Sequence, residues 1–283
     1  MAAPTAFPEL NAVLDRLVAG VAGILAENFS GAYLQGSFAV GDADEHSDVD
    51  FVVVTHDEVT TSQLEALQAL HQRLHSLGVP WAKHLEGSYI PMESLRRLDP
   101  SRRSYLYLDN GSSELEWDNH DNTNVVRWSL REYGIALAGP DPRGLIDPVS
   151  ADQLQDEVVA TMQEWAPKAC ESQDRFKAVG ELGIAMSRWK QPYVVLSYCR
   201  MLHTIAVGRV TSKPAAGAWA IGALDPTWSG LIQLALDDRP DPWERVHQSA
   251  DPEAVARTVA FVDYALTVPG VQRESSAPRS AAT

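Results

Sequence analysis

The stretch from Gly36 to Val54 reads GSFAVGDADEHSDVDFVVV, a Gly-Ser pair followed after ten residues by an Asp-x-Asp motif that opens an apolar run. Alternate residues of a strand project from one face, so Asp48 and Asp50 present two carboxylates to one point. Two anions held together favour a proton or a cation between them. Mg²⁺ takes one or two protein carboxylates and completes its shell with water and substrate phosphates, so we expect Asp48 and Asp50 to bind Mg²⁺.

The Gly-Ser pair supports this interpretation, because an isolated Asp-x-Asp is more often turn chemistry. The apolar run from Ala32 to Leu34 predicts a short buried strand that ends at Gly36. There the bare backbone can approach a phosphate, and the Ser37 hydroxyl and nearby N–H groups can donate to it. We therefore predict that Gly36 and Ser37 bind a nucleotide phosphate, and we include Ser47 among the nucleotide-binding residues.

A third carboxylate, Glu86, lies in the next candidate strand. The run from Trp81 to Ile90 alternates and places His84, Glu86 and Ser88 on one face. Glu86 can therefore reach the aspartates, as a metal ligand or as the base that takes a proton from an attacking hydroxyl. A solvated residue on an edge strand is the alternative.

These motifs together resemble the nucleotidyltransferase superfamily, whose members join a nucleotide to a hydroxyl acceptor with Mg²⁺ held by such aspartates. The resemblance implies that Asp48, Asp50 and Glu86 are catalytic residues and that all three contact the metal. It also implies that ATP is the co-substrate.

The second half of the chain narrows the resemblance. The segments YVVLSYCR at 193–200, GRV at 208–210 and SKPAA at 212–216 are similar to the C-terminal helical domain of aminoglycoside 3''-adenylyltransferases, the spectinomycin and streptomycin resistance enzymes. In that family an arginine in this helix and a lysine opening the next helix reach the ATP phosphates. The resemblance therefore implies that Arg200 and Lys213 bind the nucleotide, and it extends from about Gly31 to Trp219.

The acceptor half of that pattern matches less well. Lys190 stands where the family places an acidic residue that meets the cationic drug, and a positive charge there would repel an aminoglycoside. The segment ELEWDNHDN at 114–122 also departs from the family. We interpret it as an acceptor or nucleotide pocket in which Trp117 stacks on a ring and Glu116, Asp118 or Asp121 holds an ammonium. The resemblance places a polar ATP contact near here, which His120 or Asn122 can supply, while a helix-capping loop is the alternative.

Composition limits the class of protein. The 283 residues are enough for two domains, with 45% hydrophobic and 22% charged residues. The apolar runs are too short to cross a membrane, and Met1 to Glu9 lacks the basic start of a signal peptide, so we expect a cytoplasmic protein without membrane contact. The formal charge of −15 argues against nucleic acid as a partner and favours a cationic small molecule.

The periodicity predicts an α+β fold with two domains and a tail. Residues 1–149 are expected to form a nucleotidyltransferase domain, a small mixed sheet flanked by helices, and residues 150–270 a C-terminal all-α bundle. The tail, 271–283, is expected to be disordered. The main expected helices are 10–29, 62–77 with Ser62 as N-cap, 124–137, 150–165, 175–189, one from 192, one capped by Ser212, 230–236 and 252–266; the expected strands include 81–90 and 105–108. The histidines at 46, 56, 71 and 75 are expected on the surface.

These observations predict Mg²⁺-dependent transfer of AMP from ATP to a hydroxyl of an aminoglycoside or aminocyclitol antibiotic such as streptomycin or spectinomycin. We expect the ligands between the two domains, the usual place for a binding cleft. Two alternatives stay open: the same chemistry on another antibiotic or on a protein hydroxyl, which Lys190 favours, and a non-catalytic nucleotide-binding protein.

Overall fold

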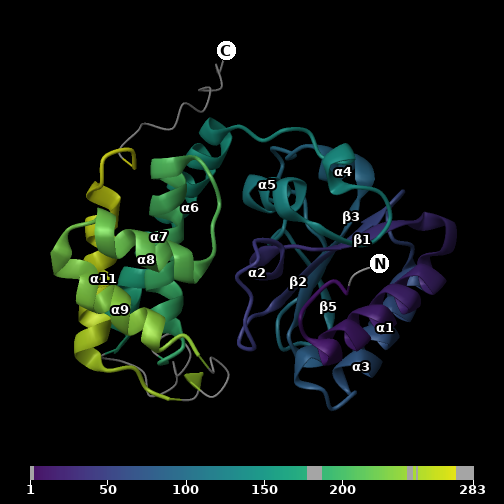
Figure 1. Cartoon of the computed structure of the whole chain (residues 1–283), viewed down its shortest axis with the longest axis horizontal. Helices are drawn as coiled ribbons and strands as arrows, with labels where there is room; N and C mark the ends of the chain where they lie inside the picture. Colours follow the sequence, from purple (N-terminus) through teal and green to yellow (C-terminus); the bar gives the residue numbers. More distant parts are fainter. Residues whose placement is uncertain (1–2, 177–186, 241–244, 247, 272–283) are drawn as a thin grey trace. The chain divides into compact units, whose positions relative to one another are not determined.

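The structure is a computed structural model that describes residues 3–176, 187–240, 245–246 and 248–271. The chain forms two compact units, Met1–Val149 and Ser150–Thr283. The first unit contains a sheet with helices and the second is helical, which confirms the predicted α+β class (Figure 1).

The sheet of the first unit has six strands in the order β5-β4-β3-β2-β1-β6. The strands are β1 (Phe29–Leu34), β2 (Val49–Thr55), β3 (Leu85–Pro91), β4 (Tyr105–Leu108), β5 (Leu115–Asp118) and β6 (Ile135–Ala138). β2 and β3 pair in parallel, and the other neighbours pair antiparallel. The sheet is therefore mixed, as expected, and the parallel pair at its centre carries the acidic motifs.

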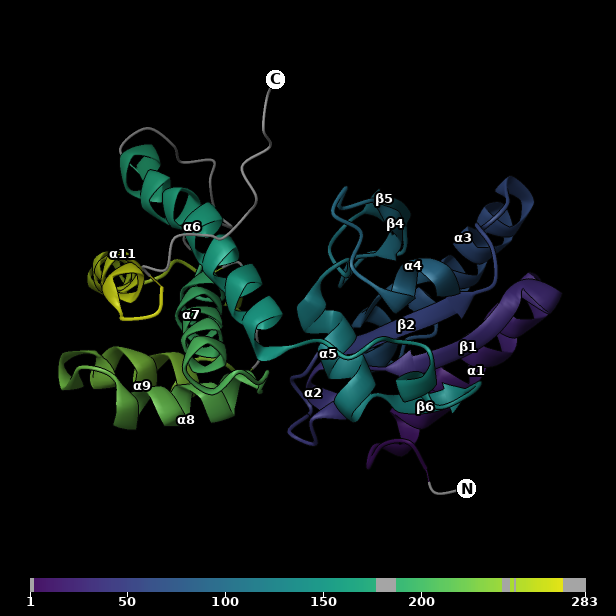
Figure 2. The ribbon, with the colours of Figure 1, turned by 90° about the horizontal axis from the view of Figure 1, so that it is seen from above.

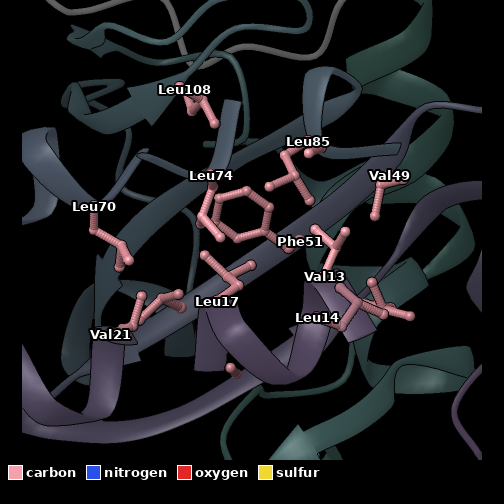
Figure 3. Close-up of a cluster of buried hydrophobic side chains, with 14 of the residues drawn as sticks. Val13, Leu14, Leu17, Val21, Val49, Phe51, Leu70, Leu74, Leu85 and Leu108 are labelled. Atoms are coloured by element: carbon pink, nitrogen blue, oxygen red, sulfur yellow. The ribbon is translucent and has the colours of Figure 1, made fainter. Parts of the chain in front are cut away.

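Helices cover both faces of this sheet (Figure 2). On one face lie α1 (Pro8–Leu25) and α3 (Thr61–His75), whose apolar residues form one core with alternate strand residues. Figure 3 shows this core, with Leu17 of α1 and Leu74 of α3 close to Phe51 of β2. The other face packs against α4 (Met92–Arg96) and α5 (Asn124–Tyr133) through a smaller cluster. Shorter elements are η1 (Ala26–Asn28), α2 (Gly36–Ala39), η2 (Pro80–Lys83) and η3 (Pro142–Gly144).

Two strands that the sequence analysis missed, β5 and β6, form the edges of the sheet. The predicted helix 124–137 was wrong in its last turn, because α5 ends at Tyr133 and the following IALA segment pairs with β1 as β6. Gly134 caps the helix at a place where a Cβ would lie 2.3 Å from the Leu130 carbonyl oxygen. The glycine therefore permits the abrupt change from helix to strand.

Three smaller predictions also need correction. The expected strand 81–90 begins only at Leu85, because Pro80 opens η2. The N-cap of α3 is Thr60 rather than Ser62, and Thr60 and Gln63 form a capping box. His71 is 1% exposed rather than on the surface, and its Nε2 lies 2.7 Å from the Tyr89 hydroxyl.

The second unit is built from helices. Those in its described residues are α6 (Ala151–Phe176), α7 (Lys190–Val207), α8 (Lys213–Ala223), η4 (Pro226–Trp228), α9 (Ser229–Asp237) and α11 (Pro252–Thr267). Ser212 caps α8 as predicted, its hydroxyl accepting a hydrogen bond from the Ala215 N–H. The predicted helix 175–189 and the predicted tail fall largely on residues outside the described part. In the part that the structure describes, no helix has the length and apolar character needed to span a bilayer.

Candidate active site

The parallel strands β2 and β3 bring the predicted acidic residues together. Asp50 and Glu86 are direct partners in the register of the two strands, so their side chains share one face of the sheet. Asp48 precedes β2 by one residue, and its carboxylate accepts a hydrogen bond from the Asn110 side-chain amide. The pairing of β2 with β3 thus brings together two residues that are far apart in the sequence.

Glu86 is held by two aromatic side chains. The Tyr107 hydroxyl donates to Glu86 Oε1 at 2.7 Å, and His120 Nε2 lies 3.2 Å from the same oxygen. The Tyr107 and His120 rings stack with their centroids 5.2 Å apart. Burial raises the pKa of Glu86 well above its usual range, and the negative charges of Asp50, Asp48 and Asp121 raise it further. A carboxyl with a raised pKa binds a proton more readily, which suits a general base.

Gly36 lies directly against the Asp50 carboxylate. Its φ of +59° is in the left-handed region, and a Cβ at this position would lie 1.9 Å from Asp50 Oδ2. The Gln35 N–H donates to the Asp50 carbonyl oxygen at 2.9 Å, which fixes the turn to β2. The predicted Gly-Ser turn and the predicted aspartate strand are therefore in contact, and only glycine fits between them. Ser37 follows in the first turn of α2 and is partly exposed.

The Ser47 hydroxyl forms its hydrogen bonds within its own loop. It is 5% exposed, its hydroxyl donates to Asp44 Oδ1 at 3.0 Å, and it accepts from the Asp44 N–H. These contacts shape the approach to Asp48. A nucleotide contact by Ser47 remains a prediction.

The residues present fit a magnesium ion that is completed by a substrate. Among the described residues, no three His, Cys, Asp or Glu side chains form a ready metal-binding group. Mg²⁺ needs fewer, since one or two carboxylates and the phosphates of a nucleotide are its usual ligands. Asp48 and Asp50 could supply the two carboxylates, and burial and the neighbouring negative charges raise the pKa of Glu86 beside them.

The predicted acceptor pocket at 114–122 does not form as a unit. β5 pairs Trp117 with Leu106 and Asp118 with Tyr105, so Trp117 and Asp118 lie on opposite faces of the sheet. Trp117 is 54% exposed and shares the face of α1 and α3, whereas Asp118 shares the face of Glu86. The segment 114–122 was expected to be a loop, but the alternating LEWD residues form β5 and separate the two side chains.

Asp121 and Asn122 are buried and hydrogen-bonded inside the first unit. Asp121 accepts from Ser88 Oγ at 2.7 Å, which does not suit the predicted contact with an acceptor ammonium. Asn122 is 1% exposed; its Oδ1 accepts from Arg127 and its Nδ2 donates to the Arg103 carbonyl oxygen, both at 2.9 Å. Because both side chains are buried, we interpret both as supports of the site, and a contact of Asn122 with ATP stays a prediction.

Tyr107 was missed as a candidate site residue, and His120 was considered only as a contact for ATP, not as a partner of Glu86. Tyr107 belongs to the segment YLYL, whose alternation already assigns it to one face of a strand. Its place beside Glu86 depends on the pairing of β3 with β4, which no local pattern reveals. His120 follows β5 and reaches Glu86 only because β5 lies beside β4.

The helical unit holds the two predicted phosphate-binding cations and Lys190. Arg200 is half-buried on α7, and Lys213 is the first residue of α8. The Lys213 ammonium lies 4.8 Å from the centroid of the Tyr193 ring, and the Lys190 ammonium lies 5.3 Å from the same centroid. Lys190 also contacts Trp189, and burial lowers its pKa. Both lysines are thus held against aromatic faces.

Comparisons with known proteins agree with this architecture. Residues 20–106 match the family of nucleotidyltransferase domains, and residues 144–266 match the C-terminal domain of aminoglycoside adenylyltransferases. The first unit thus contains the catalytic domain of a nucleotidyltransferase, and the chain is an enzyme of that class.

Individual proteins similar to this chain have more specific names than the two domain families. A spectinomycin 9-adenylyltransferase of Campylobacter jejuni is 23% identical over 253 residues, which cover 85% of this chain and 88% of the relative. One of Staphylococcus aureus is 23% identical over 241 residues, 79% of this chain and 84% of the relative. The crystal structure of spectinomycin adenyltransferase AAD(9) from Enterococcus faecialis, with ATP and spectinomycin, superimposes with a TM-score of 0.65 at 16% identity and covers 91% of this chain and 99% of that one. The chain is an aminoglycoside adenylyltransferase-like nucleotidyltransferase.

Proposed function

We propose that this enzyme transfers AMP from ATP to a hydroxyl of spectinomycin, with Mg²⁺ as the metal. The observation that carries the proposal is the register of β2 and β3, which places Asp50 beside Glu86 while Gly36 lies against the Asp50 carboxylate. The names of the relatives and the ligands of the superimposed structure support ATP and spectinomycin. Streptomycin, the other acceptor expected from the sequence, is named by none of these relatives, so we use it as a negative control.

Asp48 and Asp50 would hold the metal. Bound there, Mg²⁺ would supply the positive charge that neutralises the phosphates of the nucleotide. Gly36 and Ser37 would hold a phosphate through backbone N–H groups and the hydroxyl. Each of these residues lies in the turn and strand that the Gln35–Asp50 backbone hydrogen bond connects.

Glu86 acts as the general base in this proposal. It takes the proton of the acceptor hydroxyl, the hydroxyl oxygen forms a bond to the α-phosphorus, and the bond from the α-phosphorus to pyrophosphate breaks. Its raised pKa makes it a stronger proton acceptor, and the Tyr107 hydroxyl holds the carboxylate in place. Tyr107 is therefore part of the machinery that the sequence analysis overlooked.

Arg200 and Lys213 would provide positive charge for the departing phosphates from the helical unit, as basic side chains do in other phosphoryl transfers. Asp118 is our candidate for the acceptor's amines, because it lies on the Glu86 face of the sheet. The formal charge of −15 favours such a cationic acceptor over an anionic one.

Mass spectrometry of the acceptor tests this function. Incubation with ATP, Mg²⁺ and spectinomycin should add one AMP to the drug, and streptomycin should stay unmodified. Asp48→Asn and Glu86→Gln should abolish the transfer while leaving the protein folded. Asp57→Asn is the matched control, because Asp57 is exposed beyond the opposite end of β2. A Glu86→Gln variant with full turnover would refute the role of Glu86.

A second candidate function is the same transfer to a different acceptor. Lys190 favours it, because this cation stands where the resemblance places an acid. The two functions differ in a thermal-shift experiment, since a ligand stabilises only the state that it binds. Stabilisation by Mg²⁺ and ATP without AMP transfer to spectinomycin would support the second candidate. No response to ATP would contradict both.

A further inference from the structure

Asp121 connects two separate parts of the candidate site. It lies in the loop between β5 and α5 and is only 5% exposed. Its Oδ2 accepts a hydrogen bond from Ser88 Oγ at 2.7 Å, and its Oδ1 accepts one from Gln35 Nε2 at 3.4 Å. Ser88 and Gln35 are buried too, with 1% and 5% exposed. One buried carboxylate therefore bridges β3 and the turn that follows β1.

Both partners of Asp121 are neighbours of residues with a proposed role. Gln35 precedes Gly36, and its backbone N–H donates to the Asp50 carbonyl oxygen. Ser88 follows Glu86 by two residues in β3, so the two side chains share one face of the sheet. The Asp121 carboxylate is thus linked at one end to the phosphate turn and at the other to the strand of the proposed base.

The chemistry of the two contacts calls for a carboxylate. A carboxylate only accepts hydrogen bonds, and both of its partners here donate, Ser88 through its hydroxyl and Gln35 through its amide. An asparagine would offer only one acceptor oxygen to the two donors, so Gln35 could keep a contact only by turning its amide over, and the negative charge that both donors now face would be lost. Burying a carboxylate is costly, and burial raises the pKa of Asp121 accordingly. A loop that only connected β5 to α5 would not need a buried carboxylate.

We propose that Asp121 is a positioning residue, which fixes the Gln35–Gly36 turn relative to the Glu86 strand so that the phosphate and the base stay aligned. This inference rests on the proposed function, because it gives the turn and Glu86 the roles stated above. It replaces the expectation that Asp121 binds the ammonium of the acceptor. Asp121 itself touches neither nucleotide nor acceptor in this account.

The test is an exchange of hydrogen-bond polarity. In Asp121→Asn, Ser88 keeps an acceptor, whereas Gln35 loses its charged acceptor and can regain a contact only by turning its amide over, so the connection between the turn and β3 weakens. We expect kcat to fall about 10- to 100-fold, since a misplacement of about 1 Å can cost about 100-fold, with the KM for the acceptor unchanged. The dissociation constant for ATP, measured by calorimetry without acceptor, should rise.

Adding Gln35→Glu to Asp121→Asn reverses the bond, because the new amide can donate to the new carboxylate and the total charge returns to that of the wild type. This double variant should recover most of kcat and ATP affinity. A merely structural role would lower the melting temperature of Asp121→Asn but leave kcat unchanged below it, and that result would overturn the proposal. If Asp121→Asn fails to fold, Ser88→Ala, which removes one of the two donors, should lower kcat in the same direction, and an unchanged kcat would overturn the proposal.

The calorimetric measurement separates this inference from the proposed function. If the wild type binds ATP but does not modify spectinomycin, the proposed acceptor is wrong, and the ATP affinities of the single and double variants still decide the role of Asp121. Equal ATP affinity in the wild type and Asp121→Asn would overturn the positioning role. An increase in acceptor KM as the sole effect would overturn it as well, because it would restore the ammonium-binding role.

Discussion

Replacing Gly36 by alanine tests the contact on which the proposed site depends. The backbone at Gly36 is left-handed, with φ at +59°, and an alanine Cβ would lie 1.9 Å from Asp50 Oδ2. Ordinary contact begins at 3.4 Å, so the carboxylate or the turn must move by about 1.5 Å. Because a misplacement of about 1 Å in a catalytic site can cost about 100-fold in rate, we expect kcat/KM to fall by about 100-fold or more.

Gly41→Ala is the matched control for this change. Gly41 also has a left-handed backbone, with φ at +77°, but a Cβ there meets no atom within 4 Å. The two variants therefore share the conformational penalty of about 1–2 kcal/mol, and only Gly36→Ala adds the collision with Asp50. Pyrophosphate release measures kcat/KM, and chemical unfolding measures stability. Equal activity losses in the two variants would refute the reasoning, because backbone strain alone would then explain the effect.

Two further predictions concern a buried histidine and a lysine of the helical unit. Burial lowers the pKa of His71 from 6.5 to about 4. Between these two pH values His71 is protonated in the unfolded chain but neutral in the folded chain. The free energy of unfolding should then fall by about 3 kcal/mol between pH 6.5 and 4, and His71→Gln should remove that slope in urea titrations; an identical slope would contradict it. Lys213→Met keeps the side-chain stem near Tyr193 but removes the charge, and should raise the KM for ATP about 10- to 100-fold without affecting the KM for the acceptor, as one charge-assisted contact is worth about 1.5–3 kcal/mol. An unchanged KM for ATP would leave Lys213 without a role in nucleotide binding.

The sequence predicted the acidic part of the site because that part depends on local patterns. Alternation alone assigned Asp48 and Asp50 to one side, and it placed Glu86 and Ser88 on a common face of β3, which the structure confirms. The mixed sheet and the helical second half also follow from periodicity. These features are encoded within about ten neighbouring residues each.

The remaining part of the site depends on contacts between residues far apart in the sequence. Gln35 and Asp121 are separated by 86 positions, and no local pattern indicates that their side chains meet. The position of Trp117 opposite to Asp118 depends on β5, whose LEWD alternation was not recognised beside the polar, loop-like residues 119–122 that follow it. For the same reason the acceptor pocket expected at 114–122 was assembled from residues that the fold separates.

The strand order has a practical consequence for dividing this protein into fragments. β6 pairs with β1 at one edge of the sheet, and β5 pairs with β4 at the other. A fragment cut at residue 106, where the match to nucleotidyltransferase domains ends, would break β4 and discard both edges, leaving strands with open hydrogen-bonding groups that invite aggregation. A recombinant catalytic half should therefore extend to Val149, and we expect a fragment cut at residue 106 to aggregate more readily.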